Sequence, residues 1–197
     1  MRHEGTTLTA AEWALWGPRK FGGYGLLDCS NGPIDRGELA EIIPRSLGDT
    51  PDPVERGLPR MIVGRIPRRP TQVGVTIQKL SADHDDARRP TAASCYFYFP
   101  YEQAGETLLS YEKLFDVFSE CTLPSDGSQV RVDIQHMAIE AILERIDETA
   151  IMAAALLLTD NLVRVTQGEA VPLLQRLRFL DTVAASLPHS MRARLSV

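Results

Sequence analysis

Apolar positions in the middle of the chain follow the pattern of β-strands. Three runs, 61–64, 73–78 and 95–99, alternate apolar and polar positions or are rich in β-branched and aromatic residues. Proline residues stand at the ends of these runs, where a missing amide hydrogen breaks no ladder; they are Pro67, Pro70, Pro90 and Pro100. We expect the three strands to pair in one sheet.

The aromatic run at 95–99 predicts which side chains share a face. Alternate residues of a strand point to opposite faces of the sheet. Tyr96 and Tyr98 are therefore expected on one face and Phe97 and Phe99 on the other, with only one side of this row open to solvent.

The last part of the chain has helical spacing. Residues 111–118 carry apolar side chains at i, i+3, i+4 and i+7, and Ser110 is placed to cap that helix. The same pattern predicts a helix over 134–142 that continues or restarts near Asp147 to reach Leu158. A final helix is predicted over 173–187, with Pro172 in its first turn and Pro188 after its end. Residues 162–165 form a candidate short strand.

The first third of the chain is rich in glycine and proline, which favours short strands and loops. Leu39, Ile42 and Ile43 have helical spacing, and Pro44 is expected to stop a helix there. Residues 9–16 fit two structures. Thr9 and Glu12 form a capping-box pattern, yet the same segment fits a strand that runs into a Gly-Pro turn.

These patterns together predict an α+β fold. We expect a mixed or antiparallel sheet from the N-terminal two thirds, with the C-terminal helices packed against it. The predicted division is a strand-rich domain over 1–132 and a helical region over 133–197, packed together as one unit.

Composition narrows the function classes. The chain has 197 residues and a net charge of -5, which argues against a nucleic-acid partner because phosphate binding uses clustered Lys and Arg. The most apolar run, 150–158, is far shorter than the ~20 residues that span a bilayer, and no signal peptide is visible. The cysteines are odd in number and far apart, which suits reduced thiols in the cytoplasm; they are Cys29, Cys95 and Cys121.

The sequence contains no nucleotide-binding P-loop, no GxSxG, no HExxH and no CxxC motif, so no cofactor or metal is expected and the enzyme hypothesis is weakened. The run 83–86 (Asp-His-Asp-Asp) offers metal ligands, but a charged turn after a strand ending near Leu80 explains it more simply. Cys95 and His136 offer a nucleophile and a base. The simpler reading makes Cys95 a small core residue and places His136 at the start of a helix.

Four arginines are the candidate binding residues, because guanidinium groups bind carboxylates and phosphates in a bidentate manner; they are Arg68, Arg69, Arg88 and Arg89. Antiparallel pairing of 71–80 with 91–99 would bring Arg68 and Arg69 towards Pro100 and leave the other two at the opposite end. Hairpin geometry therefore favours two separate basic surfaces over one cluster.

Two stretches carry a family resemblance. The segment 13–17 (WALWG) followed by 22–30 (GGYGLLDCS) resembles the N-terminal domain of bacterial GTPase-associated proteins. The end of the chain, 177–181 (LRFLD) and 187–196 (LPHSMRARLS), is similar to the passage that opens the middle region of those proteins. Many members of that family carry a histidine before an aliphatic strand where this chain has 94–97 (SCYF), so no catalytic residue is carried over.

The resemblance implies a protein-interaction or scaffold module in a GTPase-associated bacterial conflict or regulatory assembly. Its partners would be other proteins, among them a small GTPase or the products of neighbouring genes. Two alternatives stay open on the residues alone: a small-anion or nucleotide-sensing domain that uses the arginines, and an enzyme built around His84, Cys95 or His136.

Overall fold

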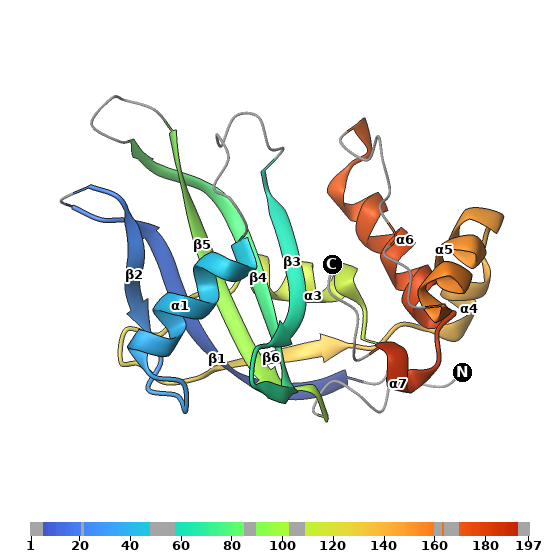
Figure 1. Ribbon diagram of the computed structural model, residues 1–197, viewed down its shortest axis with the longest axis horizontal. Coiled ribbons are helices and arrows are strands. Elements are labelled where there is room, and N and C mark those ends of the chain that lie inside the picture. The colour runs from blue at the N-terminus through green and yellow to red at the C-terminus, as the bar shows by residue number, and fades with distance from the viewer. Residues whose placement is uncertain are drawn as a thin grey trace.

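One antiparallel sheet organises the fold in a computed structural model of the chain, which describes residues 6–20, 22–47, 58–84, 90–102, 109–159, 163 and 170–192. Five strands lie in the spatial order β2 (Tyr24–Cys29), β1 (Thr6–Pro18), β5 (Pro90–Pro100), β4 (Arg69–His84), β3 (Arg60–Ile66). The sixth, β6 (Val130–Gln135), pairs with the first half of β1. With the helices around this sheet, the predicted α+β class is confirmed (Figure 1).

The predicted pairing of the central strands is also confirmed. β3 pairs antiparallel with β4, and β4 pairs antiparallel with β5, with Gln72 opposite Pro100 and Lys79 opposite Ala93. The strand expected to end near Leu80 runs on to His84 instead. It does so because β5 supplies a partner beyond a register shift, where His84 lies opposite Pro90.

Each face of the sheet carries its own core. Phe97 and Phe99 pack with Trp13 and helix α3 (Tyr111–Ser119) on one face, whereas Tyr96 and Tyr98 pack beneath helix α1 (Arg36–Leu47) on the other. The predicted alternation is confirmed. The expectation that one side of the row faces solvent is wrong, because α1 crosses that face and leaves Tyr96 3% and Tyr98 0% exposed.

Helix α1 continues past Pro44, although the sequence predicted a stop there. Burial explains the extra turn. Ile43 and Leu47 are 0% and 7% exposed against the sheet, which offsets the amide hydrogen bond that proline removes. The end of the helix is also held by Arg60, which donates to the Leu47 carbonyl at 2.9 Å.

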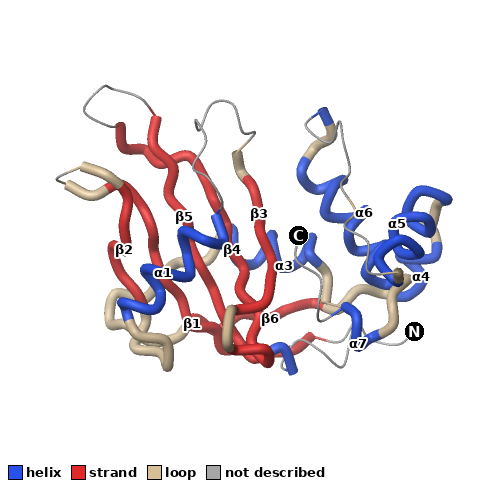
Figure 2. Tube along the Cα trace, viewed as in Figure 1, coloured by secondary structure: helices blue, strands red, loops and turns tan. Residues whose placement is uncertain are grey.

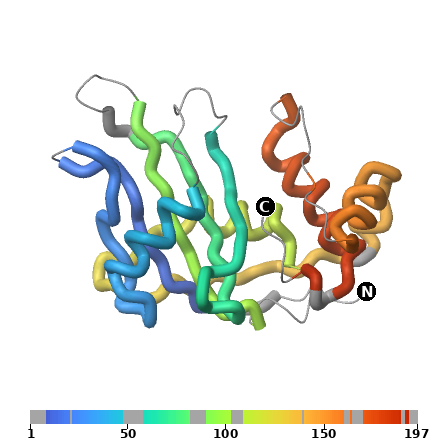
Figure 3. The backbone as a smooth tube through the Cα atoms, viewed as in Figure 1, coloured from blue at the N-terminus to red at the C-terminus, as the bar shows by residue number. Residues whose placement is uncertain are grey.

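Residues 9–16, for which the sequence left a helix and a strand open, belong to strand β1. This strand is the partner of β6. Thr7 lies opposite Ile134 and Ala11 opposite Val130, so two segments far apart in the chain run side by side (Figure 3). The helix predicted over 134–142 is therefore wrong in its first half. Only α4 (Ile139–Leu143) is helical there, and α5 (Glu148–Leu158) restarts with Asp147 as its cap, as one reading expected.

The C-terminal helices gather at one side of the sheet (Figure 2). The predicted capping of α3 by Ser110 is confirmed, and α6 (Leu173–Ala185) packs against α3 and α5 before the short α7 (His189–Arg192). Strand β6 crosses the expected domain boundary at 132/133. The candidate strand over 162–165 lies almost wholly outside the described residues.

Within the described residues, no helix is long and apolar enough to cross a membrane.

Candidate functional site

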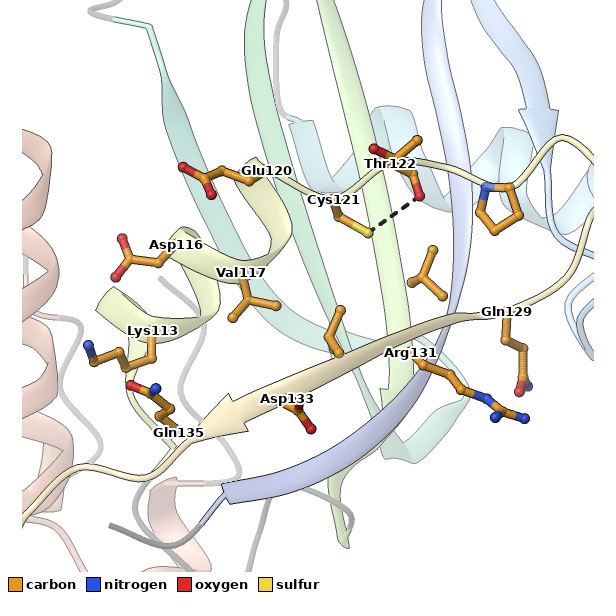
Figure 4. Close-up of a pocket in the computed structure, with 13 residues that line it drawn as sticks. Lys113, Asp116, Val117, Glu120, Cys121, Thr122, Gln129, Arg131, Asp133 and Gln135 are labelled. Atoms are coloured by element: carbon orange, nitrogen blue, oxygen red, sulfur yellow. Dashed lines mark hydrogen bonds between the residues drawn. The ribbon is translucent and has the colours of Figure 1, made fainter.

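A groove of about 770 Å³ separates α3 from β6 (Figure 4). One wall is the outer side of α3 and the loop that follows it, and the other wall is β6. The lining residues are Lys113, Asp116, Val117, Glu120, Cys121, Thr122, Pro124, Gln129, Val130, Arg131, Val132, Asp133 and Gln135.

The groove lies along the edge of β6. Side chains of β6 alternate strictly between buried and exposed, with Val130, Val132 and Ile134 in the core. Both kinds line the groove, since Val130 and Val132 appear beside Arg131 and Asp133. A cavity that meets both alternating sets faces the strand from its edge.

This edge has no strand beside it among the described residues. There β6 pairs with β1 alone, and an isolated bridge between Leu109 and His136 lies just beyond its end. Half of the backbone N–H and C=O groups of an edge strand point away from its single partner. The groove therefore presents main-chain donors and acceptors.

The helical wall of the groove is acidic. Figure 4 shows Asp116 on α3 and Glu120 directly after its last residue, with Lys113 one turn before Asp116. Burial is the main cause that raises the pKa of the Asp116 carboxyl, while Lys113 opposes the rise and the neighbouring Glu112 and Glu120 add to it. Both carboxylates are exposed, so the α3 wall presents negative charge to a ligand in the groove.

A network at the start of α3 holds this wall in position. Asp181 of α6 is 0% exposed and accepts from Ser110 Oγ at 2.8 Å and from the Tyr111 amide at 2.5 Å. Burial raises the pKa of Asp181 to about 6. Next to it, Glu112 accepts from Arg178 at 2.7 Å, which lowers the pKa of the Glu112 carboxyl.

Two of the four arginines that the sequence predicted as binding residues lie among the described residues. Arg69 forms an ion pair with Glu38 of α1 at 3.0 Å, and Arg68 occupies the β3–β4 turn with a φ of 65°. Gln72 stands opposite Pro100. Arg68 and Arg69 therefore lie near Pro100, as the antiparallel arrangement predicts. Arg88 and Arg89 lie outside the described residues, and a binding role for the four stays a prediction.

The three residues considered for catalysis lie on different elements of the described structure, His84 in β4, Cys95 in β5 and His136 directly after β6. His136 follows a strand instead of opening a helix, because β6 continues through Gln135. Burial raises the pKa of the Cys95 thiol, which keeps it in its poorly nucleophilic form. Asp83 and His84 belong to β4, and Asp85 and Asp86 lie outside the described residues. Among the described residues, no group of three or more His, Cys, Asp or Glu side chains is placed to hold a metal ion.

A second surface is apolar. Helix α5 buries only small residues, Ala150, Ala153 and Ala154, and most of its large side chains are exposed. The exposed apolar residues of α4, α5 and the turn between them are Leu143, Ile146, Ile151, Met152, Leu156 and Leu158, each 38% to 63% exposed. Exposed apolar patches of this kind are typical of protein-contact surfaces.

Comparison with known proteins adds no relative: no protein-family model, curated protein or solved structure matches the chain. The groove was also missed in the sequence. Its signal was the strict alternation of residues 130–135 (VRVDIQ), which has the period of a strand. The helical spacing predicted over 134–142 begins at Ile134 and so overlaps the end of this strand.

Proposed function

We propose that this chain is a protein-interaction module that binds an extended segment of a partner protein along β6. The observation that supports this most directly is the edge of β6, which faces a groove large enough for a peptide backbone. Addition of a strand to an exposed sheet edge is a recurring mode of peptide recognition, in which main-chain hydrogen bonds supply affinity and neighbouring pockets supply selectivity.

The groove defines the chemistry of the segment. Strand β6 has six residues, and at about 3.3 Å per residue it offers an edge of about 20 Å. A segment of about six residues would cover it. Its side chains on the α3 side would meet Asp116 and Glu120, so a lysine or arginine there would be complementary in charge to this wall.

The apolar face of α4 and α5 supports the same function. A partner that places a segment in the groove would have a further apolar surface available on the helical side of the molecule. The family resemblance of 13–30 and 177–196 implies a GTPase-associated assembly in the cytoplasm. Products of neighbouring genes, a small GTPase first among them, are therefore the partners to test.

The test begins with selection of extended peptides from a random eight-residue display library. We expect the selected peptides to contain a basic residue and to lose binding when alternate backbone amides are N-methylated, because methylation removes ladder hydrogen bonds. The charge reversals D116K and E120K should weaken binding of these peptides by about tenfold each. E144K, an exposed reversal on the helical side, is the matched control and should leave binding unchanged.

Two results would overturn the proposal. One is selected peptides that tolerate N-methylation at every position, which would exclude strand addition. The other is equal loss of binding from E144K and from the two groove variants. A neighbouring gene product that co-elutes with the chain in light-scattering chromatography should be released by the selected peptide.

A further inference from the structure

Strand β6 carries two opposite charges on its exposed face. Arg131 and Asp133 are exposed, and they alternate with the buried Val130, Val132 and Ile134. Both belong to the lining of the groove, where Figure 4 shows them at successive positions along β6. Among the described residues, neither side chain forms a hydrogen bond or an ion pair. Both charges are therefore available to a segment that lies beside β6.

The pairing rule of a sheet converts these charges into a preference. Residues that lie directly opposite each other in an antiparallel pair share a face, with Cβ atoms about 4.5–5.5 Å apart. An acidic residue opposite Arg131 and a basic residue opposite Asp133 would each form an opposite-charge pair, which stabilises such a ladder. The remaining positions would lie opposite Val130, Val132 and Ile134, which share the buried face.

The surrounding sheet favours an antiparallel segment. Every strand pairing described in this sheet is antiparallel. Antiparallel ladders are slightly more stable per residue than parallel ones, and their residues lie directly opposite each other. Read from its own N-terminus, a segment that pairs antiparallel with residues 130–134 would meet Ile134 first and Val130 last. Its order is therefore apolar, basic, apolar, acidic, apolar.

The groove has room for one added strand. Its volume of about 770 Å³ along an edge of about 20 Å corresponds to a cross-section of about 40 Å². A single strand takes about 4.8 Å in the direction of its hydrogen bonds and about 10 Å between packed layers. A second copy of this chain would bring β1 in behind its own β6, which is one strand more than this space holds. The groove therefore favours a free extended segment over a second copy.

The inner face of the segment would meet an apolar part of the groove. Val117 and Cys121 line the groove from the α3 side, and Val130 and Val132 line it from β6 (Figure 4). Apolar side chains at the inner positions would displace water from between them. The charge order concerns the outer face of the segment, so it adds to the preference for a basic residue near the acidic α3 wall.

We propose that the segment bound along β6 runs antiparallel to it and carries, from its N-terminus, the order apolar, basic, apolar, acidic, apolar. This inference rests on the proposed function, because it takes the β6 edge as the peptide site and names the sequence class of the peptide. The basic residue pairs with Asp133 and the acidic residue with Arg131. A segment with the two charges exchanged places like charges opposite each other, which destabilises the ladder.

The probes are two peptides of identical composition, TVKVEVT and TVEVKVT, each acetylated at the N-terminus and amidated at the C-terminus. TVKVEVT has the proposed order, and TVEVKVT has the two charges exchanged. Both present the same inner residues to α3, so the acidic wall contributes equally. In titrations followed by amide chemical shifts, we expect TVKVEVT to bind at least about fivefold more tightly. This difference should shrink at about 1 M salt, where charges are screened within about 3 Å.

A charge exchange in the protein locates the preference. R131D/D133R keeps the net charge and exchanges the two partners, so TVEVKVT should now bind about fivefold more tightly than TVKVEVT. E41R/R45E is the matched control, because it exchanges an exposed acid–base pair of α1 that does not line the groove. This control should keep the wild-type preference. Thermal melting verifies that each variant is folded.

Three results would overturn the inference. One is equal affinity of the folded wild-type protein for the two peptides, or a wild-type preference that R131D/D133R retains. Another is tighter binding of TVEVKVT by the wild-type protein, which would exclude the antiparallel order. The third is a dimer in light scattering that R131D dissociates, since the edge would then belong to a second copy.

The proposed function fails on a different result, the tolerance of selected peptides to N-methylation. Library peptides that lose binding on N-methylation, while TVKVEVT and TVEVKVT bind equally or not at all, would retain strand addition at β6 and remove only the charge order. The two experiments therefore separate the peptide site from its selectivity.

Discussion

The Asp181 carboxyl makes a quantitative prediction about stability and pH. It is buried between α3 and α6, where it accepts from Ser110 Oγ and from the Tyr111 amide. Burial raises its pKa from 3.8 to about 6, and the hydrogen bonds oppose that rise only in part. One pKa unit corresponds to about 1.4 kcal/mol, so the ionised carboxylate costs the native state about 3 kcal/mol.

The direction of the pH dependence follows from the two pKa values. Well below the unfolded-state pKa of 3.8, the carboxyl is protonated in both the native and the unfolded state, and the cost is absent. Between pH 4 and 6 the unfolded chain releases its proton first, so the free energy of unfolding falls. Above pH 6 the full cost of about 3 kcal/mol is present.

The substitution Asp181→Asn isolates this effect. Asparagine has nearly the same shape, accepts from the Tyr111 amide through Oδ1, and does not titrate. We expect the stability of D181N relative to wild type to rise by about 2 kcal/mol from pH 4 to pH 7, because part of the cost is already present at pH 4. Urea unfolding at a series of pH values measures this difference.

An exposed aspartate provides the control. D133N alters a solvent-facing side chain of β6, so its stability relative to wild type should change by less than about 0.5 kcal/mol over the same pH range. The reasoning would be refuted by a D181N difference that stays constant within about 0.5 kcal/mol from pH 4 to pH 7. That result would mean that the Asp181 carboxylate is fully compensated by its hydrogen bonds.

Two further predictions concern the core and the thiols. Leu177 of α6 is 3% exposed in the core that contains Phe118, so Leu177→Ala should lower the free energy of unfolding by about 2–5 kcal/mol in urea titration, and a loss below about 0.5 kcal/mol would show that the stripe is not packed. Cys29, Cys95 and Cys121 are free in the structure, so thiol titration of the unfolded protein without reductant should count three groups; a count of one would reveal a disulfide.

The sequence predicted those elements whose own residues carry a complete signal. Helix α3 has a cap at Ser110 and an apolar stripe that faces the core, and the structure reproduces both. The hairpin of β4 and β5 was predicted for the same reason, since the connection is too short for a parallel crossover. These features depend on apolar periodicity, on capping and on the length of the connection. All three can be read from residues that are close together in the sequence.

The tertiary structure decided whatever depends on a partner far along the chain. Residues 130–135 are a strand because the first half of β1 pairs with them, and α1 passes Pro44 because Leu47 reaches the sheet. The groove has the same origin. It exists because no second strand pairs with β6 in the described residues. Periodicity indicates which face of a helix or strand is apolar. Pairing and burial between distant segments determine what that face contacts.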